Sequence, residues 1–180
     1  DGNRMKKDKE KKQTYFLRAA MMVLTTIMIV LFLVIMSMVN KIQGTARVVN
    51  YAGFVRGGTQ SMVKLEISGE PQDKMYQTIS SYIEGLRNGS EELSFVRLDD
   101  KDFQNKMGEL AKYFDELRDE ILLVREKGYE NTEIIEKSEK FFRICYEAVG
   151  FAEVYSQKKA TGLDYLEKIV LVDILGLVLI

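Results

Sequence analysis

The longest apolar stretch of the chain covers residues 19–39. Its 21 residues, AAMMVLTTIMIVLFLVIMSMV, include no charged side chain. A helix rises about 1.5 Å per residue, so a helix of this length spans roughly the 30 Å hydrocarbon core of a bilayer. The pattern predicts a transmembrane helix. A cleaved signal peptide is the alternative, but its apolar region has about 7–15 residues and a small-residue cleavage site, which Ser37-Met38-Val39 matches poorly.

A second apolar segment covers residues 169–180, IVLVDILGLVLI, and we interpret it as the start of a truncated second transmembrane helix. The sequence also opens without a methionine, although Met5 would be a suitable start, so we expect it to be part of a longer protein. Asp173 is expected to snorkel to the membrane interface. The alternative is that it pairs between helices.

The region between these segments is predicted to be helical, because proline occurs only at Pro71 and alternating β-branched residues are scarce. Turn residues divide it into helices over residues 40–68, 72–88, 102–127 and 131–168. The expected fold class is all-α: a transmembrane helix, an up-down-up-down four-helix bundle, and the start of a second transmembrane helix.

The third of these helices has a regular apolar seam with alternating steps of four and three residues, which is typical of a bundle. The seam consists of Phe103, Met107, Leu110, Phe114, Leu117, Ile121 and Val124. The fourth helix is expected to bury Ile135, Phe142, Cys145, Val149 and Ala152. Cys145 is the one cysteine, and the chain has no histidine, so we interpret it as a buried structural thiol and not as a nucleophile.

The distribution of charge predicts the orientation of the chain. Residues 1–18 carry seven basic and three acidic side chains, a net charge of +4, which places this stub in the cytoplasm by the positive-inside rule. Residues 40–168 are then the extracytoplasmic domain of a cell (inner) membrane protein that contacts membrane lipid. That domain carries 19 basic and 23 acidic residues, so nucleic acid is not an expected partner.

The first extracytoplasmic helix carries two adjacent stripes, whereas a helix in a monomeric bundle needs about one apolar face. The extra stripe predicts packing against a second copy in a symmetric homodimer. The first stripe is Ile42, Ala46, Val49, Gly53, Arg56, Gln60, Val63 and Ile67, and the second is Val48, Ala52, Val55, Thr59 and Met62.

Gly53, Arg56 and Gln60 interrupt the first stripe, which is otherwise apolar. A guanidinium removed from water needs a counterion, and two Arg56 side chains at a dimer axis would repel each other unless an anion lay between them. Gly53 would let the two backbones approach. We therefore expect a small anionic or polar ligand there, bound by the guanidinium groups. The alternative is that Arg56 reaches solvent or pairs with a carboxylate of its own bundle.

The stretch ARVVNYAGFVRGGTQ, residues 46–60, resembles the membrane-proximal "P-box" helix of nitrate/nitrite sensor kinases and related pilus chemoreceptors. The matching positions are Asn50, Ala52, Gly53 and Arg56, just outside the first span. Gly57-Gly58 and Ser61 depart from the family pattern. The resemblance implies a four-helix sensor domain that binds an anion between two protomers. The expected ligand-binding residues are Gly53, Arg56, Asn50 and Gln60.

Together these features predict the ligand-sensing extracytoplasmic and transmembrane part of a bacterial signal-transduction receptor. The receptor would be a sensor kinase, a diguanylate cyclase or a chemoreceptor, and a helix shift would reach an output module after residue 180. The alternative is a membrane-anchored helical scaffold or partner-binding protein. We expect no catalysis, cofactor or metal in this part of the chain, which lacks histidine, a cysteine pair and a Gly-x-Ser-x-Gly motif.

Overall fold

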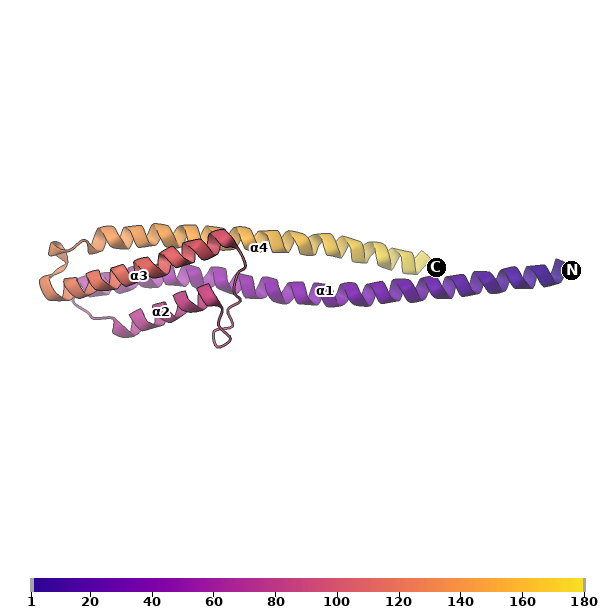
Figure 1. Cartoon of the computed structure of the whole chain (residues 1–180), viewed down its shortest axis with the longest axis horizontal. Helices are drawn as coiled ribbons and strands as arrows, with labels where there is room; N and C mark the ends of the chain where they lie inside the picture. Colours follow the sequence, from indigo (N-terminus) through magenta and orange to yellow (C-terminus); the bar gives the residue numbers. More distant parts are fainter. Residues whose placement is uncertain (1, 180) are drawn as a thin grey trace. The chain divides into compact units, whose positions relative to one another are not determined.

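The structure, a computed structural model, describes residues 2–179 and the side chains of residues 5–179. It divides into two compact units: the bundle unit, Lys41–Lys158, and an apolar helix pair formed by Asp1–Asn40 and Lys159–Ile180. The elements are α1 (Gly2–Ile67), α2 (Asp73–Asn88), α3 (Lys101–Lys127), the short 3-10 helix η1 (Tyr129–Asn131) and α4 (Ile134–Leu179) (Figure 1).

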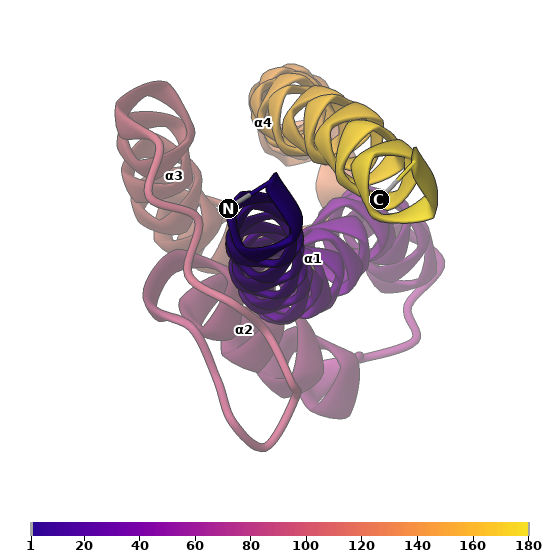
Figure 2. The same ribbon diagram turned by 90° about the vertical axis from the view of Figure 1, so that its right-hand side faces the viewer.

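The bundle unit is all-α, with four helices packed as a bundle, as the sequence predicts. The chain reverses direction at the turn after α1, at the connection of residues 89–100 and at η1 (Figure 1). Figure 2 views the helices end on and shows the 89–100 connection passing from α2 to α3. The ends of α3 are set by local chemistry: Asp100 accepts a hydrogen bond from the Phe103 N–H, and Gly128 ends the helix at φ 77°.

The seam predicted on α3 is confirmed, since all seven of its residues are buried. The fourth predicted helix begins three residues late, at Ile134, because η1 occupies residues 129–131. The prediction for Ile135 is wrong: this side chain is 58% exposed, and the neighbouring Ile134 is buried instead. The buried face of α4 is formed by Ile134, Phe141, Ile144, Cys145, Ala148 and Ala152.

The core face of α1 is the second of the two predicted stripes, not the first. Val48, Ala52, Val55, Thr59 and Met62 are all at most 5% exposed. The first stripe is half-buried or exposed as far as Gln60 and joins the core only at Val63. The polar and glycine positions of the first stripe therefore do not interrupt the core of this chain.

The 89–100 connection packs tightly against the beginning of α1 in the bundle unit. Phe95 is buried, and its ring lies 4.7 Å from that of Tyr51. A Cβ placed at Gly44 would lie only 2.5 Å from Cγ1 of Val96, so only glycine fits here without a shift. The long connection is therefore an ordered part of the bundle, anchored by apolar side chains.

In the apolar helix pair, α1 is the one helix of the described chain that is long and apolar enough to cross a membrane. Its most apolar 18-residue window has a mean hydropathy of 2.8. An N-terminal signal sequence has the same properties, so residues 19–39 are a candidate membrane span or signal sequence. The apolar end of α4 is shorter than a span needs, and its assignment as a second span stays a prediction.

Asp173 does not snorkel but is buried, with 7% of its surface exposed. Its face of α4 packs on α1 within the helix pair, because a Cβ at Gly176, three residues on, would lie 3.5 Å from Cδ1 of Leu24. The carboxylate oxygen Oδ2 has no hydrogen-bond partner in the described chain. Asp173 thus lies between the helices, as in the alternative interpretation, and its Oδ2 has no pairing partner among the described residues.

Candidate functional site

Arg56 lies on α1 and is half-buried against α4. Its guanidinium carbon is 5.4 Å from the centre of the Phe142 ring and 6.0 Å from that of the Tyr146 ring. Both distances are within the range of a cation–π contact, which stabilises a cation by roughly 0.5–1 kcal/mol at an exposed site. The arginine is thus held by aromatic rings.

No carboxylate of residues 5–179 lies within ion-pair distance of Arg56. The alternative in which it pairs with a carboxylate of its own bundle is therefore wrong for this chain. An aromatic contact does not neutralise the charge of a guanidinium, because the ring carries no net charge. Arg56 can therefore still bind an anion.

The other predicted site residues lie along α1 beside Arg56. Asn50 and Gln60 are exposed, and Gly53 is half-buried. A Cβ built at Gly53 or at Gly57 would meet no atom within 4 Å. The spacing of these residues, three or four apart, places them on one side of the helix. The structure places the four predicted residues on one outward surface. Together with Gly57 we call this surface the Arg56 face: Asn50, Gly53, Arg56, Gly57 and Gln60.

The charge of this part of α1 is of one sign. Between Lys41 and Leu65 the helix carries four basic residues and no acidic residue. The rest of the bundle unit carries more acidic than basic residues, so within the unit a net positive charge lies on this part of α1. A helix surface of this kind favours anions electrostatically.

The charge of Arg56 acts on the pKa of the nearby Cys145 thiol. Burial raises the pKa of the Cys145 thiol to about 12, although the positive charge of Arg56 acts in the opposite direction. A thiol with so high a pKa is a poor nucleophile, because the thiolate is the reactive form. The prediction that Cys145 is buried is confirmed.

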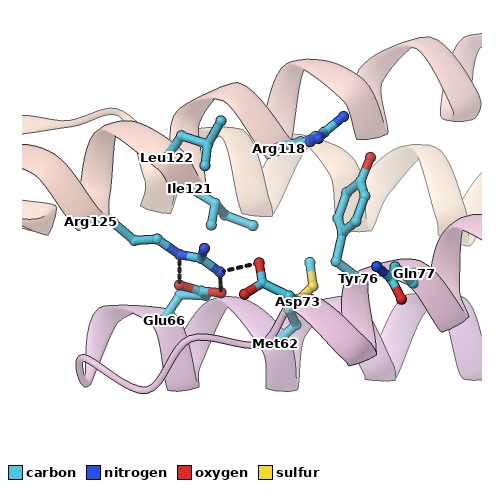
Figure 3. Close-up of a pocket in the computed structure, with 9 residues that line it drawn as sticks. All are labelled: Met62, Glu66, Asp73, Tyr76, Gln77, Arg118, Ile121, Leu122 and Arg125. Carbon is cyan, nitrogen blue, oxygen red and sulfur yellow. Dashed lines mark hydrogen bonds and ion pairs between the residues drawn. The ribbon is translucent and has the colours of Figure 1, made fainter.

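A second constellation of charged residues, which the sequence did not reveal, surrounds a cavity of about 170 Å³ between α1, α2 and α3 (Figure 3). Glu66 has only 2% of its side chain exposed. Its carboxylate accepts hydrogen bonds from Arg125 Nε at 2.9 Å, from Arg125 Nη2 at 2.6 Å and from the Gln72 N–H at 2.7 Å. Arg125 Nη2 also lies 2.9 Å from Asp73 Oδ1.

These contacts join three helices through one guanidinium. The hydrogen bonds with Glu66 raise the pKa of Arg125 above its usual value, so this arginine is charged in its pair with Glu66. The sequence did not predict the Glu66–Arg125 pair, because the two residues are 59 positions apart and no local pattern joins them. The one sequence sign was Glu66, an acid beside the apolar residues Val63 and Ile67.

Within the described residues no cluster of three or more acidic or cysteine side chains is placed to hold a metal ion. No family model matches the chain, and it matches no curated protein and no solved structure either. The resemblance to the P-box helix therefore rests on residues 46–60, and the four-helix arrangement rests on the structure.

Proposed function

We propose that this chain is the ligand-sensing extracytoplasmic and transmembrane part of a bacterial signal-transduction receptor. The observation that carries the proposal is the state of Arg56: half-buried, held against two aromatic rings, and without a carboxylate partner in the described chain. A cation–π contact at a partly exposed site stabilises the fold by only about 0.5–1 kcal/mol. A cation that is positioned but not neutralised is suited to bind a small anion.

The proposed receptor is a homodimer that packs through the Arg56 face. Gly53 and Gly57 leave open space above α1, and Phe54 beside them is 54% exposed. A second α1 could approach closely over the two glycines, and an anion between two Arg56 side chains would remove their mutual repulsion. The small ligand would then bind with Gly53 and Arg56 of both copies, as the P-box resemblance implies, and with Asn50 and Gln60 beside them.

The proposed signal is a shift of α1 against α4. Helix α1 continues without a break from the candidate span to the Arg56 face, and α4 continues from the bundle into the apolar segment after Lys168. Arg56 and its two aromatic partners lie on these two helices. Shifts of about 1–2 Å between packed helices are a common switch, and this one would reach an output module after residue 180.

In this proposal residues 1–18 are cytoplasmic, residues 19–39 and the segment from residue 169 contact lipid in the inner membrane, and residues 40–168 form the extracytoplasmic sensor domain. The domain has no catalytic role of its own. The output is a kinase, a diguanylate cyclase or a chemoreceptor module. The second candidate, a membrane-anchored scaffold, is favoured by the exposed apolar side chains of Tyr146 and Val154 on α4, which are 64% and 50% exposed.

Thermal unfolding of the full chain in lipid nanodiscs tests the proposal. Sodium nitrate, nitrite, acetate and phosphate are compared with chloride at constant ionic strength. A ligand at 100 times its Kd stabilises by about 2.7 kcal/mol, which raises the Tm of a domain of this size by on the order of 10 °C. We expect at least one anion to give such a shift, and Arg56→Gln to abolish it.

Arg47→Gln is the matched control, because it removes an exposed basic side chain of the same helix. It should keep the shift. If no anion shifts the Tm, or if Arg47→Gln and Arg56→Gln behave alike, the sensor function at Arg56 is wrong and the scaffold becomes the better account.

A further inference from the structure

The cavity between α1, α2 and α3 has both an apolar wall and charged ends. Met62, Ile121 and Leu122 form the apolar wall, and the Leu122 side chain is 49% exposed (Figure 3). The volume of about 170 Å³ is below the roughly 300–1,000 Å³ of pockets for drug-sized molecules. The cavity therefore suits a small metabolite with an aliphatic part.

One charged end of the cavity is the carboxylate of Asp73. Both carboxylate oxygens of Glu66 accept hydrogen bonds from Arg125. Asp73 contacts Arg125 through Oδ1 alone, and its side chain is 73% exposed. Its second oxygen, Oδ2, is therefore an available acceptor for a ligand cation. Figure 3 shows the Asp73 carboxylate extending from α2 towards α3.

The opposite end is the guanidinium of Arg118 on α3. Its carbon lies 5.3 Å from the centre of the Tyr76 ring, and that ring stacks on Phe114 at 4.9 Å with an interplanar angle of 3°. No carboxylate of residues 5–179 is within ion-pair distance of Arg118. Like Arg56, it is positioned by an aromatic ring and keeps its charge.

Both charged ends line the same cavity. Tyr76, on which Arg118 rests, follows Asp73 by three residues on α2, and such positions are neighbours about 5–6 Å apart on a helix. Charge-assisted hydrogen bonds are about 2.7–2.9 Å long. A ligand that carries both an ammonium and a carboxylate group can therefore meet a group of opposite charge at each end of the cavity.

We propose that this cavity binds a small zwitterion of the aliphatic amino acid class. The ligand carboxylate pairs with Arg118, its ammonium group pairs with Oδ2 of Asp73, and its side chain covers Met62, Ile121 and Leu122. The site lies within one bundle and uses none of the residues of the Arg56 face. It is thus independent of the anion site proposed above.

Titration calorimetry of the full chain in nanodiscs with L-leucine tests this site. Two analogues serve as probes: 4-methylpentanoate, which lacks the ammonium group, and 3-methylbutylamine, which lacks the carboxylate. We expect saturable binding of leucine and at least tenfold weaker binding of each analogue. Arg118→Gln and Asp73→Asn should each weaken leucine binding at least tenfold.

Asp115→Asn and Arg97→Gln are the matched controls, since both side chains are exposed and neither lines this cavity. They should leave leucine binding unchanged, as should Arg56→Gln, so a failure here is distinct from a failure at Arg56. The proposal is overturned if leucine shows no saturable binding, if the amine binds as tightly as leucine, or if binding survives in Arg118→Gln, whose folding is checked by circular dichroism.

Discussion

Arg125 and Arg56 belong to the same bundle, but the first is neutralised by carboxylates and the second is not. Arg125 contacts two carboxylates, one of them almost fully buried, and joins α3 to α1 and to the start of α2. Arg56 contacts two aromatic rings and no carboxylate of the described chain. The first arrangement holds helices together, and its carboxylates neutralise the guanidinium. The second holds the side chain in place and leaves the charge for a partner.

The largest effect is expected at Glu66. Glu66→Ala removes the carboxylate that neutralises Arg125 and leaves a partly buried guanidinium with only the exposed Asp73. Breaking a buried pair by removing one partner costs about 3–5 kcal/mol, and we expect about 3 kcal/mol because Arg125 keeps some access to water. Urea unfolding of the full chain in nanodiscs measures the loss. Glu70→Ala, at an exposed position four residues on, should change stability by less than about 0.5 kcal/mol.

Glu120 is a second buried carboxylate that is paired with a cation, as Glu66 is. It is 4% exposed and accepts hydrogen bonds from Lys137 and, at 2.7 Å, from the Glu133 N–H. Burial disfavours its charged form, but these two hydrogen bonds outweigh burial, so the pKa of Glu120 is lowered. Glu120→Gln should cost about 2 kcal/mol at pH 7, the range of a charge-assisted hydrogen bond.

The lowered pKa also fixes the pH dependence of this effect. An acid with a lowered pKa stabilises the fold above the pKa of the unfolded state, about 4.3 for glutamate, and loses that contribution as the pH falls through its folded pKa. The difference in stability between the parent and Glu120→Gln should therefore shrink below about pH 4. A difference that stays constant down to pH 3 would contradict the assignment.

Substitution of two glycines of α1 by alanine should change stability by smaller amounts and in opposite directions. Gly44→Ala places a methyl group 2.5 Å from Val96, and overpacking of this kind costs about 1–3 kcal/mol. Gly57→Ala meets open space and should stabilise the isolated bundle by about 1 kcal/mol through helix propensity. Chemical denaturation of both variants at low protein concentration checks this pair. A loss of stability in Gly57→Ala would mean that the space above it is filled.

The smallest effect on stability is expected at Arg56 itself. Without an anion, Arg56→Gln gives up only the cation–π contacts of one guanidinium with two rings at a half-exposed site, so stability should change by about 1 kcal/mol. The same urea unfolding series measures it. A loss as large as that of Glu66→Ala would show that Arg56 is a structural residue, and the contrast between the two arginines would disappear.

Periodicity was sufficient to predict the elements of the bundle. The 4-3 seam of α3 is a local signal, and the structure has it where it was expected. The choice between the two stripes of α1 was beyond the sequence, because both were compatible with helical packing and only the tertiary structure selects one. Ile135 was misplaced because the 3-10 turn after Gly128 delays the start of α4.

Only the local features of the candidate site could be predicted from the sequence. Arg56 stands out locally as a charge in an apolar stripe. Its aromatic partners, Phe142 and Tyr146, lie 86 or more residues away and carry no motif. The Glu66–Arg125 pair is equally non-local. Pairings across a bundle depend on helix rotation, which the sequence pattern of a single helix does not determine.

The most direct test of the Arg56 face is cross-linking between copies in membranes. Gly57→Cys is introduced with Cys145→Ala, and disulfide formation is followed with and without the anion that gives the largest thermal shift. We expect a symmetric cross-link at position 57 whose yield changes with the anion and no longer responds to it in Arg56→Gln. Cysteine at the exposed Lys112 of α3 should not cross-link. No cross-link at position 57 under any condition, or equal yields at positions 57 and 112, would contradict a ligand-dependent dimer built on this face.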